Sequence, residues 1–298
     1  MMKQFIITAI ILTLSHISGF SQTAQPLFEL PTPPEKMDNF YDRCNFSVEH
    51  YWDKCNWKQA IKDTEGLETA FENWVQLLPH AAADTVRLSA NRVITANAKN
   101  PKALLQVANL AEKYMYSDAG DYIIEEVYLL FADAVASNKK IKPADKARFA
   151  ADAKRIKSSA VGNIAPDLTL YLADGTKTSL HNIKGKEHIL FFNDPDCGDC
   201  NIARIRLSTD QSVKALIDAK RMTLISIYPG EPSDDWMIEV RDYPENWIVA
   251  AAPDADDYFK LDKMPAIYNL EKDYKIKLKD VRADVLVNAL RALVDRTK

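Results

Sequence analysis

The sequence lacks any apolar run long enough to cross a membrane. Its early apolar stretch, FIITAIILTL, covers about ten residues, whereas a membrane-spanning helix needs roughly twenty. It also lacks a large excess of charge, because 38 Lys and Arg residues face 42 Asp and Glu residues, for a net charge of -4. No basic stripe is present for nucleic acid or for an acidic membrane surface. We therefore expect no nucleic-acid partner and no insertion into a membrane.

Cysteine is scarce. Four cysteines in 298 residues are too few for a scaffold built on disulfides. A zinc site is not predicted either, because the sequence contains one C-x-x-C, no second one, and no H-x-x-x-H. With 47% hydrophobic and 27% charged residues, the composition is that of a globular protein with enough length for two cores.

The first 21 residues have the pattern of a secretory signal peptide. Lys3 precedes the apolar run, and the small residues Gly19 and Ser21 follow it. This order of charge, apolar run and small residues predicts cleavage after Ser21 and export of the mature chain. Disulfides can persist in such a chain.

The next two segments differ in proline content and in the spacing of their apolar residues. Residues 22–36 contain four prolines, at positions 26, 31, 33 and 34, and predict an extended lead-in. Residues 37–159 have apolar residues at steps of three and four, which predicts an all-helical domain. The expected amphipathic or helical stretches are 40–55, 67–78, 84–98, 101–116, 122–136 and 143–157.

Residues 160–298 switch to short β-prone runs separated by helical segments, which predicts an α/β domain. A turn at Asp174-Gly175 predicts a hairpin ahead of the first buried strand. The expected strands are 168–172, 188–192, 222–228, 247–251, 266–270 and 276–278, and the expected helices begin at Cys197, Ser233, Ala255 and Arg282.

The segment FFNDPDCGDCNIARIRL carries the strongest chemical signal. A buried strand ends at Phe192, a turn follows, and Cys197 stands where a helix begins. Unpaired amides and the positive end of the helix dipole stabilise a thiolate, which is the form of cysteine that attacks a disulfide. Cys197 is therefore the predicted nucleophile. Cys200, one helical turn further, is the predicted resolving cysteine.

The surrounding sequence resembles the TlpA/ResA-type periplasmic thioredoxin-like proteins, over about residues 160 to 298. The lead-in IAPDLTLYLADGTKTSLHNIKGKEHILFFNDPDCGDC matches their pattern at Ala165, Pro166, Asp167, Gly175, Ser179, Leu180, Gly185 and Lys186. The resemblance implies a central mixed sheet flanked by helices, a periplasmic location and thiol-disulfide oxidoreductase activity. It also implies that KMPAIYNL holds a cis-proline, Pro265, opposite the cysteines, and that the backbone of Met264 pairs with an extended substrate.

The helical region has a likeness of its own. EHYWDKCNW and LAEKYMYSDAGDYIIEEVYLLFADAV resemble an uncharacterised helical domain that precedes thioredoxin-like domains in secreted bacterial proteins. From this arrangement alone, we interpret residues 37–159 as a docking or dimerisation module.

Two departures from the thioredoxin pattern bear on the chemistry. Phe191 and Ala203 stand where related proteins carry a buried acid, so the usual proton acceptor is missing. Asp196 and Asp199 instead flank Cys197, and their negative charge is predicted to raise the pKa of its thiol. Because this destabilises the reduced form, we predict a reductant more than a strong oxidant.

Several functions stay open at this point. The leading one is a disulfide reductase or isomerase that acts on protein thiols and disulfides, is restored by an inner-membrane thiol donor, and needs no cofactor besides the Cys197–Cys200 disulfide. A thiol peroxidase is a weaker alternative, because the P-x-x-x-T-x-x-C arrangement is absent around Cys197. A third is a secreted binding module with a degenerate thioredoxin fold, in which the C-x-x-C is an inert structural disulfide.

Cys44 and Cys55 lie on one apolar stripe. On an unbroken helix, their eleven-residue separation amounts to about 16 Å, which is too far for a disulfide. We predict free thiols. The alternative is a disulfide that needs a helix break between Asn45 and Ser47.

Overall fold

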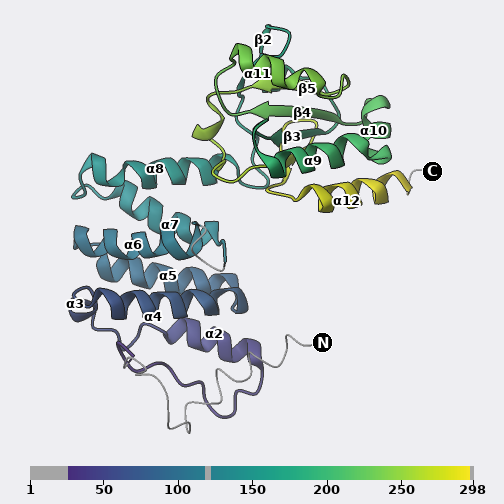
Figure 1. Cartoon of the computed structure of the whole chain (residues 1–298). Helices are drawn as coiled ribbons and strands as arrows, with labels where there is room; N and C mark the ends of the chain where they lie inside the picture. The colour runs from purple at the N-terminus through teal and green to yellow at the C-terminus, as the bar shows by residue number, and fades with distance from the viewer. Residues whose placement is uncertain (1–25, 118–121, 296–298) are drawn as a thin grey trace. The chain divides into compact units, whose positions relative to one another are not determined.

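The computed structural model describes residues 26–117 and 122–295 (Figure 1). The predicted signal peptide, residues 1–21, lies outside the described residues, as does the start of the lead-in. The described residues form two compact units, one that ends at Ala96 and one that begins at Asn97. The predicted domain boundary at residue 160 stays a prediction, because compactness does not show which segments fold alone.

The first unit is helical. Its helices are α2 (Phe40–His50), α3 (Trp57–Ala60), α4 (Thr64–Leu77) and α5 (Ala83–Asn97). The Trp74 side chain is fully buried, and its Nε1 donates to Ser89 Oγ at 3.1 Å, while the Ser89 hydroxyl donates to the carbonyl of Val48 at 2.8 Å. The Trp52 ring lies 5.0 Å from that of Trp57 and 5.8 Å from that of Trp74. Trp52 and Trp74 are therefore core residues, and Trp57 is a partly exposed neighbour.

The first observed helix, α2, is shorter than the predicted helical stretch 40–55. α2 ends at His50, and the amides of Asp53 and Cys55 then bond to carbonyls only three residues earlier, which makes turns instead of helix. The helix continues unbroken from Asn45 to Ser47. Cys44 and Cys55 are both free, which confirms the prediction.

The second unit opens with three further helices, α6 (Pro101–Met115), α7 (Glu125–Ser137) and α8 (Pro143–Ser158). The Asn100 side chain caps α6 by accepting from the amides of Lys102 and Ala103, and Pro101 occupies the first turn, where its missing amide costs no hydrogen bond. α7 begins three residues later than predicted. The amide of Ile124 bonds to the carbonyl of Met115 and so cannot follow a helical pattern.

A mixed sheet follows, with the strand order β2-β1-β5-β4-β3-β6-β7. The interior strand β3 pairs in parallel with β4 and antiparallel with β6. The bounds of the strands are β1 (Thr169–Leu172), β2 (Lys177–Ser179), β3 (His188–Phe192), β4 (Thr223–Tyr228), β5 (Ile248–Ala251), β6 (Ala266–Leu270) and β7 (Ile276–Leu278). This arrangement confirms the predicted fold class and the hairpin at Asp174-Gly175, where Gly175 has a φ of +84°.

Both faces of β3 are buried, because successive side chains point to opposite sides of a strand. Ile189 and Phe191 belong to one apolar cluster, with residues from the helices of the unit, and Leu190 and Phe192 belong to the other. The helices that supply the first cluster are α9 (Gly198–Thr209), α10 (Gln211–Asp218), α11 (Asp234–Glu239) and α12 (Ala283–Asp295). β3 is thus held on two sides, which fixes the position of the loop that follows it.

One predicted helix is wrong. Ala255–Asp257 forms a single 3-10 turn, because the amides of Tyr258 and Phe259 both return to the carbonyl of Ala255 and Phe259 then enters the core. The predicted helices at Ser233 and Arg282 are present as α11 and α12.

Candidate active site

Cys197 stands at the junction of β3 and α9. Its backbone is extended, with φ -82° and ψ 116°, and its Sγ accepts a hydrogen bond from the amide of Cys200 at 3.2 Å. Cys197 is therefore the N-cap of α9, and its sulfur lies at the positive end of the helix. This position is the one that the strand-turn-helix pattern predicts.

The two cysteines form a disulfide and differ in exposure. Their Cα atoms are 5.2 Å apart. Cys197 is partly exposed, whereas Cys200 is 1% exposed. Because Cys197 is the more exposed residue of the two, the geometry suits the predicted division between nucleophile and resolving cysteine.

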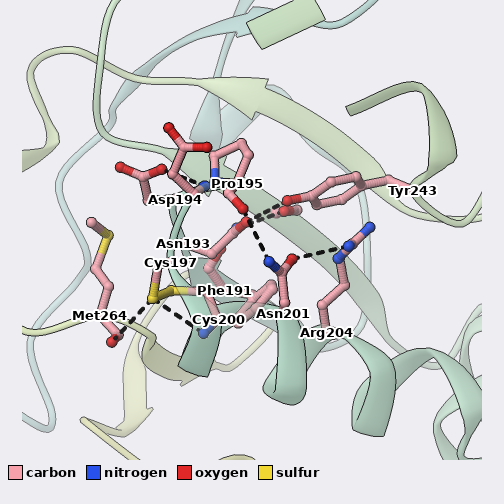
Figure 2. The surroundings of a disulfide bond; sticks show 12 residues. Phe191, Asn193, Asp194, Pro195, Cys197, Cys200, Asn201, Arg204, Tyr243 and Met264 are labelled. Carbon is pink, nitrogen blue, oxygen red and sulfur yellow. Dashed lines mark hydrogen bonds between the residues drawn. A yellow bond between two sulfur atoms is a disulfide. The ribbon is translucent and has the colours of Figure 1, made fainter. Parts of the chain in front are cut away.

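Met264 lies beside the disulfide. Its carbonyl oxygen is 3.6 Å from Cys197 Sγ (Figure 2). The Met264–Pro265 peptide bond is cis. The structure thus brings together Cys197, Cys200 and Met264 from two segments more than sixty residues apart. The predicted substrate contact at Met264 and Pro265 stays a prediction.

Asp196 and Asp199 flank the nucleophile and are both exposed. Asp199 lies in the first turn of α9, and the amide of Asp196 bonds to Asp194 Oδ1 at 2.9 Å. The carbonyl of Asp194 also accepts the amide of Cys197 at 3.1 Å. Asp194 therefore shapes the turn before the helix. The predicted effect of Asp196 and Asp199 on the Cys197 pKa stays a prediction.

A buried polar group lies behind the site. Asn193 is 3% exposed. Its side-chain nitrogen Nδ2 donates to the carbonyl of Phe191 at 2.9 Å and to Ser226 Oγ at 2.7 Å. Its side-chain oxygen accepts from the Tyr243 hydroxyl at 2.8 Å. Burial raises the pKa of Tyr243 despite the opposing charge of Arg204, and the carboxylates of Asp194 and Glu239 raise it further, so its hydroxyl stays protonated and donates.

Sequence reasoning missed this group. At the two positions where related proteins carry a buried acid, this chain has the buried apolar residues Phe191 and Ala203. The buried polar groups next to the site are instead neutral: the side-chain amide of Asn193 and the hydroxyls of Ser226 and Tyr243. The signal that was available is Ser226, a polar residue in the middle of the apolar strand TLISIY.

A second set of contacts connects the turn to α9. Asn201 donates to the carbonyl of Pro195 at 3.1 Å, and Arg204 donates to Asn201 Oδ1 at 3.0 Å. The Arg204 guanidinium also lies over the Tyr243 ring, 4.5 Å from its centroid. Figure 2 shows these side chains side by side next to the disulfide. The turn that carries Cys197 is therefore attached to the first turns of α9.

Within residues 26–117 and 122–295, no group of three or more His, Cys, Asp or Glu residues is arranged to hold a metal ion. No helix in the same part of the chain is long and apolar enough to cross a membrane.

Two parts of the chain are similar to known proteins. A domain of unknown function, DUF5106, matches residues 12–159. A thioredoxin-like protein from Bacteroides caccae has 27% sequence identity and a TM-score of 0.73, over 89% of this chain and 98% of that chain. A search of curated proteins finds no match.

Shorter structures also match. The thioredoxin domain of a thiol-disulfide oxidoreductase from Bacteroides vulgatus has 24% identity and a TM-score of 0.40, over 45% of this chain and 98% of that chain. A thiol:disulfide interchange protein from Bacteroides sp. has 24% identity and a TM-score of 0.40, over 46% of this chain and 92% of that chain. The chain therefore combines a helical region similar to DUF5106 with a thioredoxin-like fold that carries the Cys197–Cys200 disulfide.

Proposed function

We propose that this protein is a periplasmic thiol-disulfide oxidoreductase, acting as a disulfide reductase or isomerase on protein substrates. The observation that supports it most directly is the asymmetry of the disulfide. Cys197, a partly exposed residue, caps a helix beside the Met264 carbonyl, and its partner Cys200 is buried.

The reaction starts from the reduced form. The Cys197 thiolate attacks one sulfur of a substrate disulfide, forms a mixed disulfide, and releases the other substrate sulfur as a thiolate that takes up a proton. The Cys200 thiolate then attacks Cys197 Sγ, which re-forms the Cys197–Cys200 disulfide and releases the second substrate thiol. Two electrons pass from the protein to the substrate. A thiol donor, proposed to reside in the inner membrane, returns two electrons and two protons.

The surroundings of Cys197 favour a reductant. The helix start stabilises the thiolate, whereas the exposed carboxylates of Asp196 and Asp199 oppose it. A less stable thiolate makes the reduced form a better electron donor. Equilibration with glutathione tests this direction, and a couple at the oxidising end of the thioredoxin range contradicts it.

Reduction of insulin by dithiothreitol tests the activity itself. The wild type is expected to accelerate the reaction, and Cys197→Ser to abolish the acceleration because no nucleophile remains. Cys200→Ser is expected to retain attack and to accumulate mixed disulfides with substrate proteins. Cys55→Ser is the matched control and is expected to keep full activity, because Cys55 lies outside the site.

The competing functions give different results in the same assays. Turnover of hydrogen peroxide without insulin reduction indicates a peroxidase. A wild-type protein that is silent in both assays, with a Cys197 that resists alkylation after reduction, indicates a binding module and overturns the proposal.

A further inference from the structure

The 255–264 loop connects β5 to β6 and ends at the disulfide. Its last residue, Met264, has its carbonyl oxygen 3.6 Å from Cys197 Sγ. Its Phe259 ring is fully buried, 4.8 Å from the ring of Phe192 on β3 and 5.0 Å from that of Tyr268 on β6. The loop is therefore anchored to the two strands that lead into the site.

The loop also makes polar contacts with helices that precede the sheet. Lys260 Nζ donates to the carbonyl of Tyr116 at the end of α6, and it lies 4.2 Å from the centroid of the Tyr116 ring. The carbonyl end of a helix carries partial negative charge, and the face of an aromatic ring attracts a cation. The Lys260 side chain is only 17% exposed, so water screens these attractions weakly. Lys260 also forms an ion pair within the loop, with its Nζ 3.7 Å from Asp262 Oδ2.

The end of α6 is itself held in place. The Tyr116 ring stacks on that of Tyr128 in α7, with centroids 4.7 Å apart and planes at 18°. Tyr128 is fully buried, and its hydroxyl donates to Asp152 of α8 at 2.6 Å. Lys260 is thus attached to a buried cluster that joins three helices.

Arg155 of α8 holds the start of the same loop. Its Nε donates to the carbonyl of Asp256 at 2.6 Å, while its Nη1 bonds to Asp152 Oδ1 at 3.2 Å. The neighbouring pair of Lys154 and Asp257 is largely exposed and contributes little. The loop is therefore held by α8 at Asp256 and by α6 at Lys260, four residues before Met264.

We propose that α6, α7 and α8 act as a positioning element for the disulfide site, with Arg155 and Lys260 as the positioning residues that fix the 255–264 loop. This inference rests on the proposed function, because it takes Met264 as the backbone contact of a protein substrate. It assigns a role to the last helices of the region similar to DUF5106: they determine how well an extended substrate is aligned with Cys197.

Kinetics with a large and a small disulfide test the proposal in the full chain. Lys260→Met removes the charge and keeps most of the side-chain length. The KM for insulin is expected to rise about five-fold with kcat changed less than about two-fold, because substrate alignment is lost while the thiols are untouched. Reduction of dithiobis(nitrobenzoate), which needs no backbone pairing, is expected to be unchanged. Arg155→Met is expected to act in the same direction, and Lys260→Arg to restore the KM.

Lys157→Met is the matched control. Lys157 is also on α8, but it pairs with Asp133 of α7 at 2.5 Å and does not touch the loop. A double variant that combines Arg155→Met with Lys260→Met is expected to have a raised KM for insulin as well. An unchanged KM in this double variant, or an equal rise in KM in Lys157→Met, overturns the inference. A parallel loss with the small disulfide also overturns it, because the defect then lies in the thiols.

Hydrogen exchange gives a readout that does not depend on activity. Backbone amides of the 255–264 loop are expected to exchange at least about five-fold faster in Lys260→Met than in the wild type or in Lys157→Met. If the wild type fails to reduce insulin, the proposed function fails, and the exchange rates alone then decide whether the helices hold the loop. Equal exchange rates in all three proteins overturn the positioning role.

Discussion

At the scale of single residues, the four cysteines occupy four different environments. Cys197 caps a helix and is partly exposed, and Cys200 is buried behind it. Cys44 is buried within α2, and Cys55 lies partly exposed in the turn before α3. Since the reactivity of a thiol follows its ionisation and its exposure, these environments predict an order of reaction.

Alkylation of the reduced protein by iodoacetamide is expected to modify Cys197 first. Burial raises the pKa of Cys55 to about 12, and burial also raises that of Cys44. At pH 8, a thiol with that pKa is ionised in only about one molecule in ten thousand. Peptide mapping by mass spectrometry is expected to show modification of Cys197 at least about ten-fold faster than of Cys55. Between pH 8 and pH 9, the rate at Cys55 is expected to rise about ten-fold, and equal rates at both cysteines contradict the assignment.

The site is predictable from sequence only in part. The C-x-x-C spacing after an apolar strand predicts Cys197 at a helix start, and the resemblance predicts a cis-proline at Pro265. The Asn193, Ser226 and Tyr243 contacts are not predictable, because their hydrogen bonds join residues 33 and 50 positions apart and no local pattern records such a pairing.

At the scale of elements, three helices of the thioredoxin-like fold meet at Asp210. This residue ends α9 and caps α10, with its Oδ1 accepting from the amides of Ser212 and Val213. Arg291 of α12 donates to its other oxygen at 2.6 Å. The Asp210 side chain is 5% exposed, so a single buried carboxylate joins the helices that support the disulfide.

Asp210→Ala is expected to lower the free energy of unfolding by about 1–3 kcal/mol at pH 7, because a helix cap and a hydrogen-bonded charge pair are lost together. Burial raises the pKa of Asp210, but the hydrogen bonds from Arg291, Val213 and Ser212 outweigh it and hold the pKa below the ordinary value of 3.8. The stabilisation is therefore complete above pH 3.8 and is lost as the pH falls through the folded-state pKa. Urea unfolding at several pH values measures the difference.

Asp84→Ala is the matched control for that measurement. Asp84 pairs with Arg87 on an exposed face of α5, and its side chain is 89% exposed. Little change in stability is expected. A penalty for Asp210→Ala that persists unchanged at low pH contradicts the role of its charge.

Element boundaries follow local chemistry where a cap is present. Asn100-Pro101 predicts the start of α6, and the observed helix begins there. The end of α2 and the single turn at Ala255 are not predictable in the same way. Trp52 and Phe259, which follow them, are buried against residues distant along the chain, and no local pattern records such contacts.

At the scale of the whole molecule, the helical region and the compact units do not coincide. The DUF5106 match spans residues 12–159, whereas the compact units divide between Ala96 and Asn97. α7 belongs to the same compact unit as the sheet, and its Glu125 pairs at 2.5 Å with Lys279, which follows β7. Apolar periodicity predicts helices but not which of them pack on a neighbouring sheet, so the sequence alone could not indicate this division.

Export is the prediction that concerns the whole chain. The pattern of residues 1–21 predicts that the mature protein begins at Gln22 and accumulates in the periplasm. Mass spectrometry of the N-terminal peptide from a periplasmic fraction checks both points. Recovery of an intact chain that begins at Met1 from the cytoplasm contradicts the proposed location.

The N-cap bond at Cys197 places the attacking sulfur of the proposed reaction 3.2 Å from the backbone amide of the resolving cysteine. A thiolate accepts that amide hydrogen more strongly than an uncharged sulfur does, so we expect the first turn of α9 to be held most tightly in the reduced form. In the proposed reaction, formation of the mixed disulfide removes this charge. We therefore expect the hold on Cys200 to weaken at the step in which Cys200 attacks.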